Sequence, residues 1–452
     1  MLSKEDNQLL CRVGPGTPMG NLMRQYWLPA IRSDELPASD CPPLRVKLLG
    51  EELIGFRMTS GRVGLIQSAC PHRGASLYYG RNEDEGLRCV YHGWKFDGEG
   101  RCVDMPSEPA ESNFKGKVQT AAYKTHERNG IIWAYMGPRT SAEVPLLPDL
   151  EATLLSSDPE RISILHRACN WMQGLEGELD TVHAAFLHWG FDEPGEPGSL
   201  TYYHFRHRAH PHFTAMDTDF GCAYGCYRPA EADSYYWRIG HVLFPFYAMQ
   251  AAGPMGPEAK LNAYVPMDDE HTLQWELYVR TDGTESGFSR AGRYAINRGG
   301  ASEQEPTRRG RYVPQGTGWH DRFNIEQNLA NDYLIDREAQ REKKSFSGIP
   351  GIRQQDMAMT ETMGPIYNRS NEHLGTSDSM IIRARRRWIA AAKALRDEGA
   401  LPPGVDAPEL YRQRSGEVVL PRSVDWWDGT KQLRERFDAK VERPVAVGGA
   451  GG

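Results

Sequence analysis

Residues 70–94 read CPHRGASLYYGRNEDEGLRCVYHGW and decide the fold of the first part of the chain. The motif Cys70-x-His72 opens this stretch, and Cys89-x2-His92 lies near its end. Each pair offers one thiolate and one imidazole, and both groups are common metal ligands. The stretch also contains Gly74, Gly80 and Gly93, and glycine favours the tight turns needed around a compact bound group.

The mixed pairs favour a two-iron, two-sulfur cluster. Structural zinc sites usually combine cysteine with cysteine and histidine with histidine. In a Rieske cluster two cysteines hold one iron and two histidines hold the other, which raises the reduction potential. We expect Tyr91 and Trp94 to shield this group from water. A zinc site and four unrelated buried residues are the alternatives.

Short β-type runs separated by glycine surround the motif. They are LRVKLLGEELIGFRM (44–58), GRVGLIQ (61–67), LRCVYHGWKFDGEG (87–100) and GIIWAYMG (130–137). Such runs predict a small antiparallel domain over residues 1–150, with a helical N-terminal segment and a core at about 25–137. The proline-rich polar stretch from Pro138 to Pro159 predicts the boundary.

The rest of the chain reads as a mixture of strands and helices. We expect a second domain over 151–443 and a disordered tail over 444–452. The predicted elements are a helix within Asn170–Trp189, strands within 200–280, a surface loop over 283–318, and helices at Asp321–Glu342 and Ser379–Glu398. The fold class is therefore α+β.

A second group of possible ligands lies in NWMQGLEGELDTVHAAFLHWG (170–190), as Asp180-x2-His183-x4-His188. Two histidines and a carboxylate on one face of Fe(II) leave positions open for dioxygen and substrate. On a regular helix, Asp180 and His183 lie about 60° apart, but His183 and His188 lie about 140° apart. We therefore predict a bend, a π-bulge or a helix end between the two histidines.

Together these motifs resemble the Rieske non-haem iron ring-hydroxylating oxygenases, whose α subunits place a catalytic domain with the Asp-x2-His-x4-His signature after a Rieske domain. The run NDYLIDREAQREKKSFSGIPGIRQQDMAMTETMGPIYNRSNEHLGTSD (331–378) is similar to the phthalate 4,5-dioxygenase branch. The resemblance covers most of the chain. It implies a helix-grip (START-like) catalytic domain, with a curved antiparallel sheet and flanking helices.

The resemblance also implies a role for each site residue. The implied cluster ligands are Cys70, His72, Cys89 and His92. The mononuclear iron would be held by His183, His188 and a distant aspartate; Asp356 matches best, and Asp332, Asp336 and Asp378 compete with it. Asp180 would bridge His183 to His92 of a neighbouring subunit. The two centres of one chain would lie too far apart, so a trimer or a stacked pair of trimers is implied.

The segment YYHFRHRAHPHF (202–213) contains candidate substrate-binding residues. In a strand, one face would carry His204, Arg206, Arg208, His210 and His212. This segment is either part of a pocket or a solvated strand or loop. By resemblance an arginine grips the substrate carboxylate. The candidates for this arginine are Arg206, Arg208 and Arg238, and His212 is a further candidate substrate residue.

The implied activity is that of a terminal oxygenase in a multicomponent system. It would use dioxygen to monohydroxylate or cis-dihydroxylate an aromatic compound, most simply an aromatic carboxylate of the phthalate or benzoate type. O-demethylation of a methoxylated, lignin-derived acid is the alternative, and an electron-transfer protein is a more remote one. A separate NAD(P)H reductase with FMN and a plant-type 2Fe-2S centre would supply electrons, because no GxGxxG fingerprint occurs here.

The composition of the chain argues against several other classes of partner. The chain has 452 residues, with Lys+Arg 53 against Asp+Glu 60 and a net charge of −7, which argues against nucleic-acid binding. The strongest apolar run, Val242–Met249, is short and interrupted by Pro245, so no membrane span is expected. The charged N-terminus does not resemble a signal peptide, and eight cysteines are too few for a disulfide scaffold. We expect a cytoplasmic protein.

Overall fold

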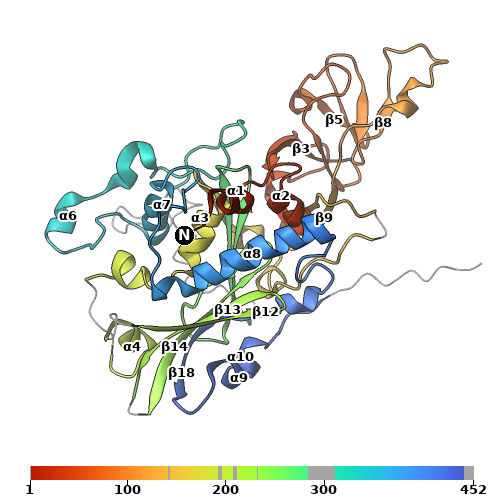
Figure 1. Ribbon diagram of the computed structural model, residues 1–452. Helices are drawn as coiled ribbons and strands as arrows, with labels where there is room; N and C mark the ends of the chain where they lie inside the picture. The colour runs from red at the N-terminus through yellow and green to blue at the C-terminus, as the bar shows by residue number, and fades with distance from the viewer. Residues whose placement is uncertain are drawn as a thin grey trace, which may run out of the picture.

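The computed structural model describes residues 2–140, 143–191, 196–206, 211–231, 233–282 and 311–441. Two β-rich regions make up the protein (Figure 1). The N-terminal region holds three small antiparallel sheets, and the C-terminal region holds one eight-stranded antiparallel sheet with helices beside it. The predicted α+β class is confirmed.

The N-terminal region follows the predicted β runs. Its sheets are β1 (Trp27–Arg32), β10 (Ile131–Tyr135) and β9 (Lys124–Arg128); β2 (Leu44–Leu48), β3 (Glu51–Arg57) and β4 (Val63–Gln67); and β5 (Arg81–Glu83), β6 (Gly86–Arg88), β7 (Lys95–Asp97) and β8 (Cys102–Asp104). A separate hydrophobic core lies between the last two sheets and includes Phe56, Leu87 and Phe96 together with Cys70 and Cys89. The two cysteines of the motif are therefore part of a packed core.

The large sheet of the C-terminal region is built from strands distant in sequence. Its order is β11 (Ser163–Arg167), β17 (Thr272–Arg280), β16 (Glu258–Pro266), β15 (Tyr247–Met249), β14 (Ser234–Leu243), β13 (Gly221–Pro229) and β12 (His212–Thr218), with β18 (Gly416–Pro421) paired to β14. The helices α3 (Trp171–Leu179) and α7 (Ile352–Glu361) contact each other, and α3 also contacts β16. This corner between two helices and the sheet forms the site described below.

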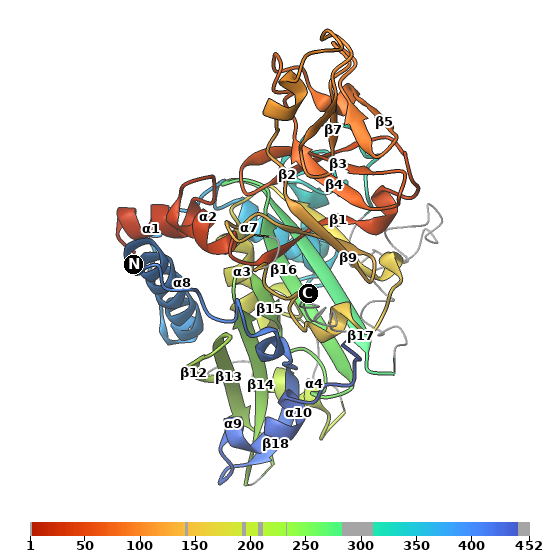
Figure 2. The same cartoon turned by 90° about the vertical axis from the view of Figure 1, so that its right-hand side faces the viewer.

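The long helix α8 (Ser379–Glu398) confirms the prediction for that segment. Its buried side chains recur every three or four residues, at Met380, Ala384, Trp388 and Ala392, so one face packs on β12 and β13. Gly399, with a φ of 70°, ends the helix. Figure 2 shows α1 (Lys4–Cys11) and α2 (Pro18–Met23) beside α8. The short helices are α4 (Leu200–Arg206), α6 (Arg337–Arg341), α9 (Trp426–Gly429) and α10 (Lys431–Arg434).

Two predictions of secondary structure are wrong. Residues 200–206 form α4 rather than a strand, and the neighbouring residues Tyr203 and His204 are both buried, which does not fit the alternation of a half-buried strand. The helix predicted over Asp321–Glu342 is replaced by an irregular segment, a 3-10 turn (Leu329–Leu334) and α6. Positive φ angles at Asp332 and Tyr333 break it. Most of the predicted loop 283–318 and the tail 444–452 lie outside the described residues.

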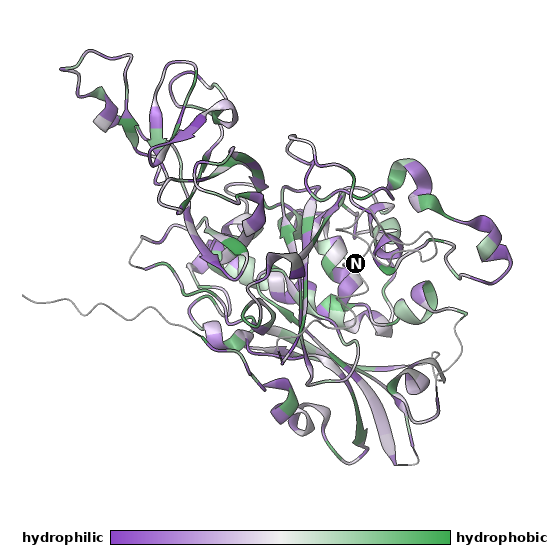
Figure 3. Ribbon diagram, turned by 180° about the vertical axis from the view of Figure 1, so that it is seen from behind, coloured by the Kyte–Doolittle hydropathy of each residue, from purple (hydrophilic) through white to green (hydrophobic). Residues whose placement is uncertain are grey.

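Hydrophobic and hydrophilic residues alternate along the helices (Figure 3). Among the described helices, none combines the length and the apolar character that crossing a membrane requires.

The turn between β16 and β17 joins the two regions. The N–H of Leu49 donates to the carbonyl of Pro266 at 3.1 Å, and the N–H of Gly50 donates to that of Met267 at 2.8 Å. These bonds tie the β2–β3 turn of the N-terminal region to the large sheet.

Asp268, in the same turn, is the centre of a charged cluster. Its Oδ2 is 3.0 Å from Nζ of Lys47 on β2 and 3.1 Å from Nε2 of His320, and its Oδ1 is 2.9 Å from Nδ1 of His271. Asp268, His271 and His320 bring possible metal-ligand atoms within 4.8 Å of one another. Because Lys47 already supplies a positive charge to this carboxylate, we interpret the cluster as a clasp, that is, a set of ion pairs that holds the two regions together.

The substitution Asp268→Ala is expected to lower the free energy of unfolding by about 2 kcal/mol, because it leaves the Lys47 ammonium group without its partner in a mostly buried position. This loss corresponds to a melting temperature about 2 °C lower, measured by thermal unfolding. Asp397→Ala, which removes an exposed partner of Arg396, is the control and should leave the melting temperature unchanged. Equal shifts in both variants would contradict the role of the clasp.

Candidate metal centres

Two histidines and one aspartate converge where α3, α7 and the large sheet meet. The Nε2 atoms of His183 and His188 are 3.1 Å apart. Oδ1 of Asp356 lies 3.4 Å from Nε2 of His183 and 3.2 Å from Nε2 of His188. All three ligand atoms lie within 4.8 Å of one another. Of the four aspartates predicted as third ligand, Asp356 is the one that lies beside the histidines.

The local backbone explains why the two histidines face the same point. The helix α3 ends at Leu179, with Asp180 as its C-cap, and residues Ala184–His188 form a π-helical turn. A π-helical turn pairs residue i with residue i+5, so side chains five positions apart lie on one face. The predicted distortion is confirmed, and it brings together rings that a regular helix would separate.

The other nitrogen of each ring has its own partner. Nδ1 of His183 lies 3.7 Å from Oδ2 of Asp180. Nδ1 of His188 lies 2.6 Å from Oε1 of Gln355, whose Nε2 donates to the carbonyl of Ile349 at 2.8 Å. Because the amide of Gln355 is oriented by Ile349, its oxygen accepts from Nδ1–H of His188. The Nε2 atom of His188 then carries the lone pair that a metal needs.

The carboxylates beside the two histidines favour a bound cation. Burial would lower the pKa of His183, but Asp180 and Asp356 outweigh it and raise that pKa to about 10. Burial would raise the pKa of Asp356, but the two imidazoles, His188 foremost, hold it well below its ordinary value. A proton on His183 therefore stands where a divalent cation would balance the carboxylates. The donor set suits a metal such as Fe(II).

The group opens into a cavity of about 160 Å³. Helix α7 contributes Asp356 and Met359, and the sheet contributes Tyr224, Arg238 and Tyr264. Apolar walls with a few charged groups are typical of a small-molecule site.

The motif of residues 70–94 forms two loops with the same backbone bonding. The N–H of Cys70 donates to the carbonyl of Ala75, and the N–H of Gly74 donates to that of Cys70, both at 2.8 Å. Cys89 repeats the pattern, bonded to Trp94 at 2.8 Å and to Gly93 at 2.9 Å. Both glycines have positive φ angles, 75° and 79°, which glycine adopts without strain. The loops thus present two equivalent ligand arms.

The side chains of these loops fit a metal cluster. Burial, more than the adjacent Cys89 thiol, raises the pKa of Cys70 to about 11, so its thiolate requires a nearby cation. Nδ1 of His72 is buried and has no hydrogen-bond partner within the described part of the chain, as expected of a ligand atom. Trp94 stacks on His72 at 4.3 Å and covers it. Tyr91 is 58% exposed, and its ring lies 3.9 Å from that of His92, so its shielding role stays a prediction.

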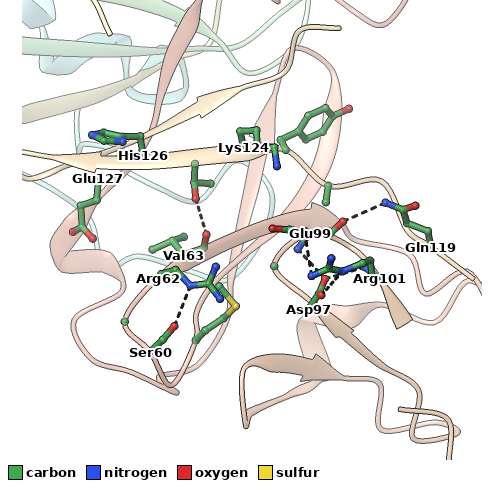
Figure 4. A pocket seen from close by; sticks show the side chains of 16 residues that line it. Ser60, Arg62, Val63, Asp97, Glu99, Arg101, Gln119, Lys124, His126 and Glu127 are labelled. Atoms are coloured by element: carbon green, nitrogen blue, oxygen red, sulfur yellow. Dashed lines mark hydrogen bonds and ion pairs between the residues drawn. The ribbon is translucent and has the colours of Figure 1, made fainter. Parts of the chain in front are cut away.

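A larger groove lies on the N-terminal region, between the β3–β4 turn, the β7–β8 turn and β9 (Figure 4). Among its charged side chains, Arg101 pairs with Asp97 at 2.8 Å and with Glu99 at 3.2 Å. It opens to solvent and contains none of the predicted ligands, so we do not assign catalysis to it.

The comparison with protein families agrees with this geometry. Residues 26–123 match the Rieske [2Fe-2S] domain, and residues 134–443 match the family described as LigXa C-terminal domain like. A relative from Comamonas testosteroni, the oxygenase subunit of 3-chlorobenzoate-3,4-dioxygenase, is 44% identical over 96% of this chain and 99% of that protein. The chain belongs to the Rieske non-haem iron oxygenases. These oxidoreductases carry a 2Fe-2S cluster and a mononuclear iron.

Another relative of this Rieske oxygenase is the phthalate 4,5-dioxygenase oxygenase subunit of Pseudomonas putida, 37% identical over 95% of this chain and 94% of that protein. Among solved structures, NdmA of Pseudomonas putida CBB5 with caffeine has a TM-score of 0.55 at 18% identity, over 86% of this chain and 96% of that chain. The terminal oxygenase of carbazole 1,9a-dioxygenase from Nocardioides aromaticivorans has a TM-score of 0.51 at 18% identity, over 84% of this chain and 98% of that chain. The solved structures support the fold.

The predicted substrate residues of this Rieske oxygenase lie in different places. Arg238 is buried on β14 and lines the cavity. His212 is exposed on β12 and stacks on Tyr227, and it is absent from the cavity lining. Arg206 is the last residue of α4, and Arg208 lies outside the described residues. The shared strand face predicted for this segment is wrong, because residues 200–206 are helical.

Sequence reasoning missed Gln355 and Arg353. Gln355 precedes Asp356 directly, and neighbouring residues of a helix point to different faces, so no spacing rule links it to His188. Arg353 lies three residues before Asp356 on the same helical face, a spacing that would have identified it had the helix been predicted.

The substitution Gln355→Leu is expected to weaken binding of the mononuclear iron by about 10- to 100-fold, because His188 loses the acceptor that fixes its orientation and tautomer. Iron content after dialysis, compared with cluster absorbance, measures this effect. Gln355→Glu keeps an acceptor oxygen at the same reach and should retain the iron. Full iron retention by Gln355→Leu would contradict the role of Gln355.

Proposed function

We propose that this chain is the terminal oxygenase of a system that hydroxylates an aromatic carboxylate. The observation that best supports this proposal is the convergence of His183, His188 and Asp356 beside a cavity that Arg238 also lines. The two relatives cited above act on 3-chlorobenzoate and phthalate according to their names, and both substrates are aromatic carboxylates. A guanidinium group can grip such a carboxylate with two hydrogen bonds.

The proposed ligand sets follow from this geometry. Cys70, Cys89, His72 and His92 hold the 2Fe-2S cluster, and His183, His188 and Asp356 hold the mononuclear iron. When bound, this iron supplies the activation of dioxygen. Cis-dihydroxylation places both oxygen atoms on the ring, whereas monohydroxylation places one there and reduces the other to water; each outcome consumes two electrons and two protons.

Electrons reach the iron from a neighbouring subunit in this proposal. The strands β5 and β8 lie at the upper right of Figure 1, whereas α3 and α7 lie left of centre. Asp180 is next to Nδ1 of His183, on the side of the ring opposite Asp356. A partner's His92 hydrogen bonded to Asp180 would link the two centres through one carboxylate. A trimer or a stacked pair of trimers would provide this arrangement. The proposed domains of each chain are residues 1–150 and 151–443.

An electron-donor protein is the other partner. A solved relative is a carbazole 1,9a-dioxygenase oxygenase in complex with a ferredoxin. For this chain we propose an NAD(P)H reductase with FMN and a plant-type 2Fe-2S centre. The chain would act in the cytoplasm, where NAD(P)H is available.

O-demethylation is a second candidate. The oxygenase subunit of 5,5'-dehydrodivanillate O-demethylase from Sphingobium is 31% identical over 93% of this chain. Hydroxylation of a methoxy carbon would release formaldehyde. A panel of phthalates, benzoates and methoxylated aromatic acids, analysed for diols, phenols and formaldehyde, distinguishes the two reactions.

The variant His183→Ala is expected to lose oxygenation while keeping the cluster absorbance, because it removes one ligand of the mononuclear iron alone. Co-expression with a His92→Cys chain tests the route between subunits. Each variant alone should be inactive, and mixed oligomers should recover part of the activity. Full turnover by His183→Ala would exclude His183 as a ligand of a catalytic iron, and no recovery in mixed oligomers would exclude transfer between subunits.

The variant Arg238→Met is expected to raise the KM for 3-chlorobenzoate or phthalate by about 10- to 100-fold, the usual cost of a lost hydrogen bond to a charged group. Glu417 lies 3.2 Å from Arg238, so the double variant Arg238→Met/Glu417→Gln controls for an unpaired buried carboxylate. An equal loss with an uncharged aromatic compound would exclude Arg238 as the carboxylate anchor.

A further inference from the structure

Arg353 contacts the oxygen of Asp356 that the two histidines do not share. Nη1 of Arg353 lies 3.2 Å from Oδ2 of Asp356. Oδ1 of Asp356 is the oxygen that lies 3.4 Å and 3.2 Å from the Nε2 atoms of His183 and His188. The two oxygens of this carboxylate therefore have different partners.

The guanidinium group of Arg353 is held on several sides. Its Nε pairs with Glu276, and its Nη2 donates to the hydroxyl of Tyr278 at 3.0 Å; both partners are on β17. Its Nη1 is 3.2 Å from Oε2 of Glu178 on α3. Arg353 is only 5% exposed. Three of its partners belong to β17 and α3, so the guanidinium group is anchored to elements outside α7, the helix that carries Arg353 and Asp356.

Glu178 is itself fixed by the sheet. Its Oε1 accepts a hydrogen bond from Nδ2 of Asn262 at 2.6 Å, and its Oε2 accepts one from the hydroxyl of Tyr264 at 2.7 Å. Both donors are on β16. A continuous set of hydrogen bonds thus runs from β16 through Glu178 and Arg353 to Asp356.

We propose that Arg353 is a positioning residue that holds Oδ2 of Asp356, so that this carboxylate offers the iron a single oxygen. The inference rests on the proposed function, in which Asp356 is an iron ligand. A carboxylate that binds through one oxygen occupies one coordination position instead of two and leaves the other for dioxygen or substrate. Arg353 also lines the cavity, but its nitrogens already serve four acceptors, so we do not assign it to substrate binding.

The test uses the holoenzyme with Arg353→Gln and Arg353→Lys. Fe(II) affinity is measured by competition with a chelator, and the geometry at the iron is measured by the EPR signal after addition of nitric oxide. Arg353→Gln should bind Fe(II) at least about 10-fold more weakly and give an altered signal, with unchanged cluster absorbance. Arg353→Lys keeps the charge and should restore part of the affinity. In iron-loaded Arg353→Gln, kcat should fall while KM stays close to that of the parent.

Arg369→Gln is the matched control. Arg369 is also buried and pairs with a glutamate of α3, Glu176, at 2.9 Å, but it does not contact Asp356. Its loss should leave the Fe(II) affinity and the EPR signal unchanged.

Unchanged affinity and EPR signal in Arg353→Gln would overturn the proposal, and so would a raised KM with unchanged iron binding. If Arg353→Gln does not fold, an unchanged EPR signal in Arg353→Lys overturns it. The variant Asp356→Ala distinguishes a failure of the proposed iron ligand set from a failure of the proposed role of Arg353. Iron retained by Asp356→Ala would reject the ligand set, whereas iron lost there but kept by Arg353→Gln would reject the role of Arg353 alone.

Discussion

The need to balance buried carboxylates organises the C-terminal half of this Rieske oxygenase. Asp356, Glu178 and Glu276 lie within one corner of the fold, and Arg353 contacts all three. Two imidazoles complete the group on the far side of Asp356. Burying this many charges is costly unless each has a partner, so α3, α7 and the sheet have to meet in one arrangement. The π-helical turn is the local distortion that allows His183 and His188 to join it.

The proposed cluster site follows a different design. Its ligands lie on two consecutive loops, and each loop is closed by its own backbone hydrogen bonds around a glycine with positive φ. The cysteines pack into the hydrophobic core of their own region. The C-terminal region reaches this core through Trp319, and it is also joined to the N-terminal region by the β16–β17 turn and by the contact of Lys47 with Asp268.

Local patterns were the part of the fold that could be predicted. The β runs around residues 70–94, the helix α8 and the distortion between His183 and His188 follow from spacing within a few turns of chain. Predictions were wrong where a short pattern fitted two structures, as in residues 200–206, or where positive φ angles broke an apparent helix near Asp332. Positive φ is uncommon for residues other than glycine, so the local sequence gives little signal of those angles.

The sequence by itself determined that two ligand motifs of fixed spacing are present, because the residues that bind one metal from one loop or helix must be close neighbours along the chain. Resemblance to a family also selected Asp356 from four aspartates. Only the tertiary structure decided which distant groups contact these residues: Gln355 beside His188, Glu178 beside Arg353, and Asp268 beside Lys47. Such partners come from strands and helices far apart in sequence, and side chains at that separation meet only when burial brings their elements together.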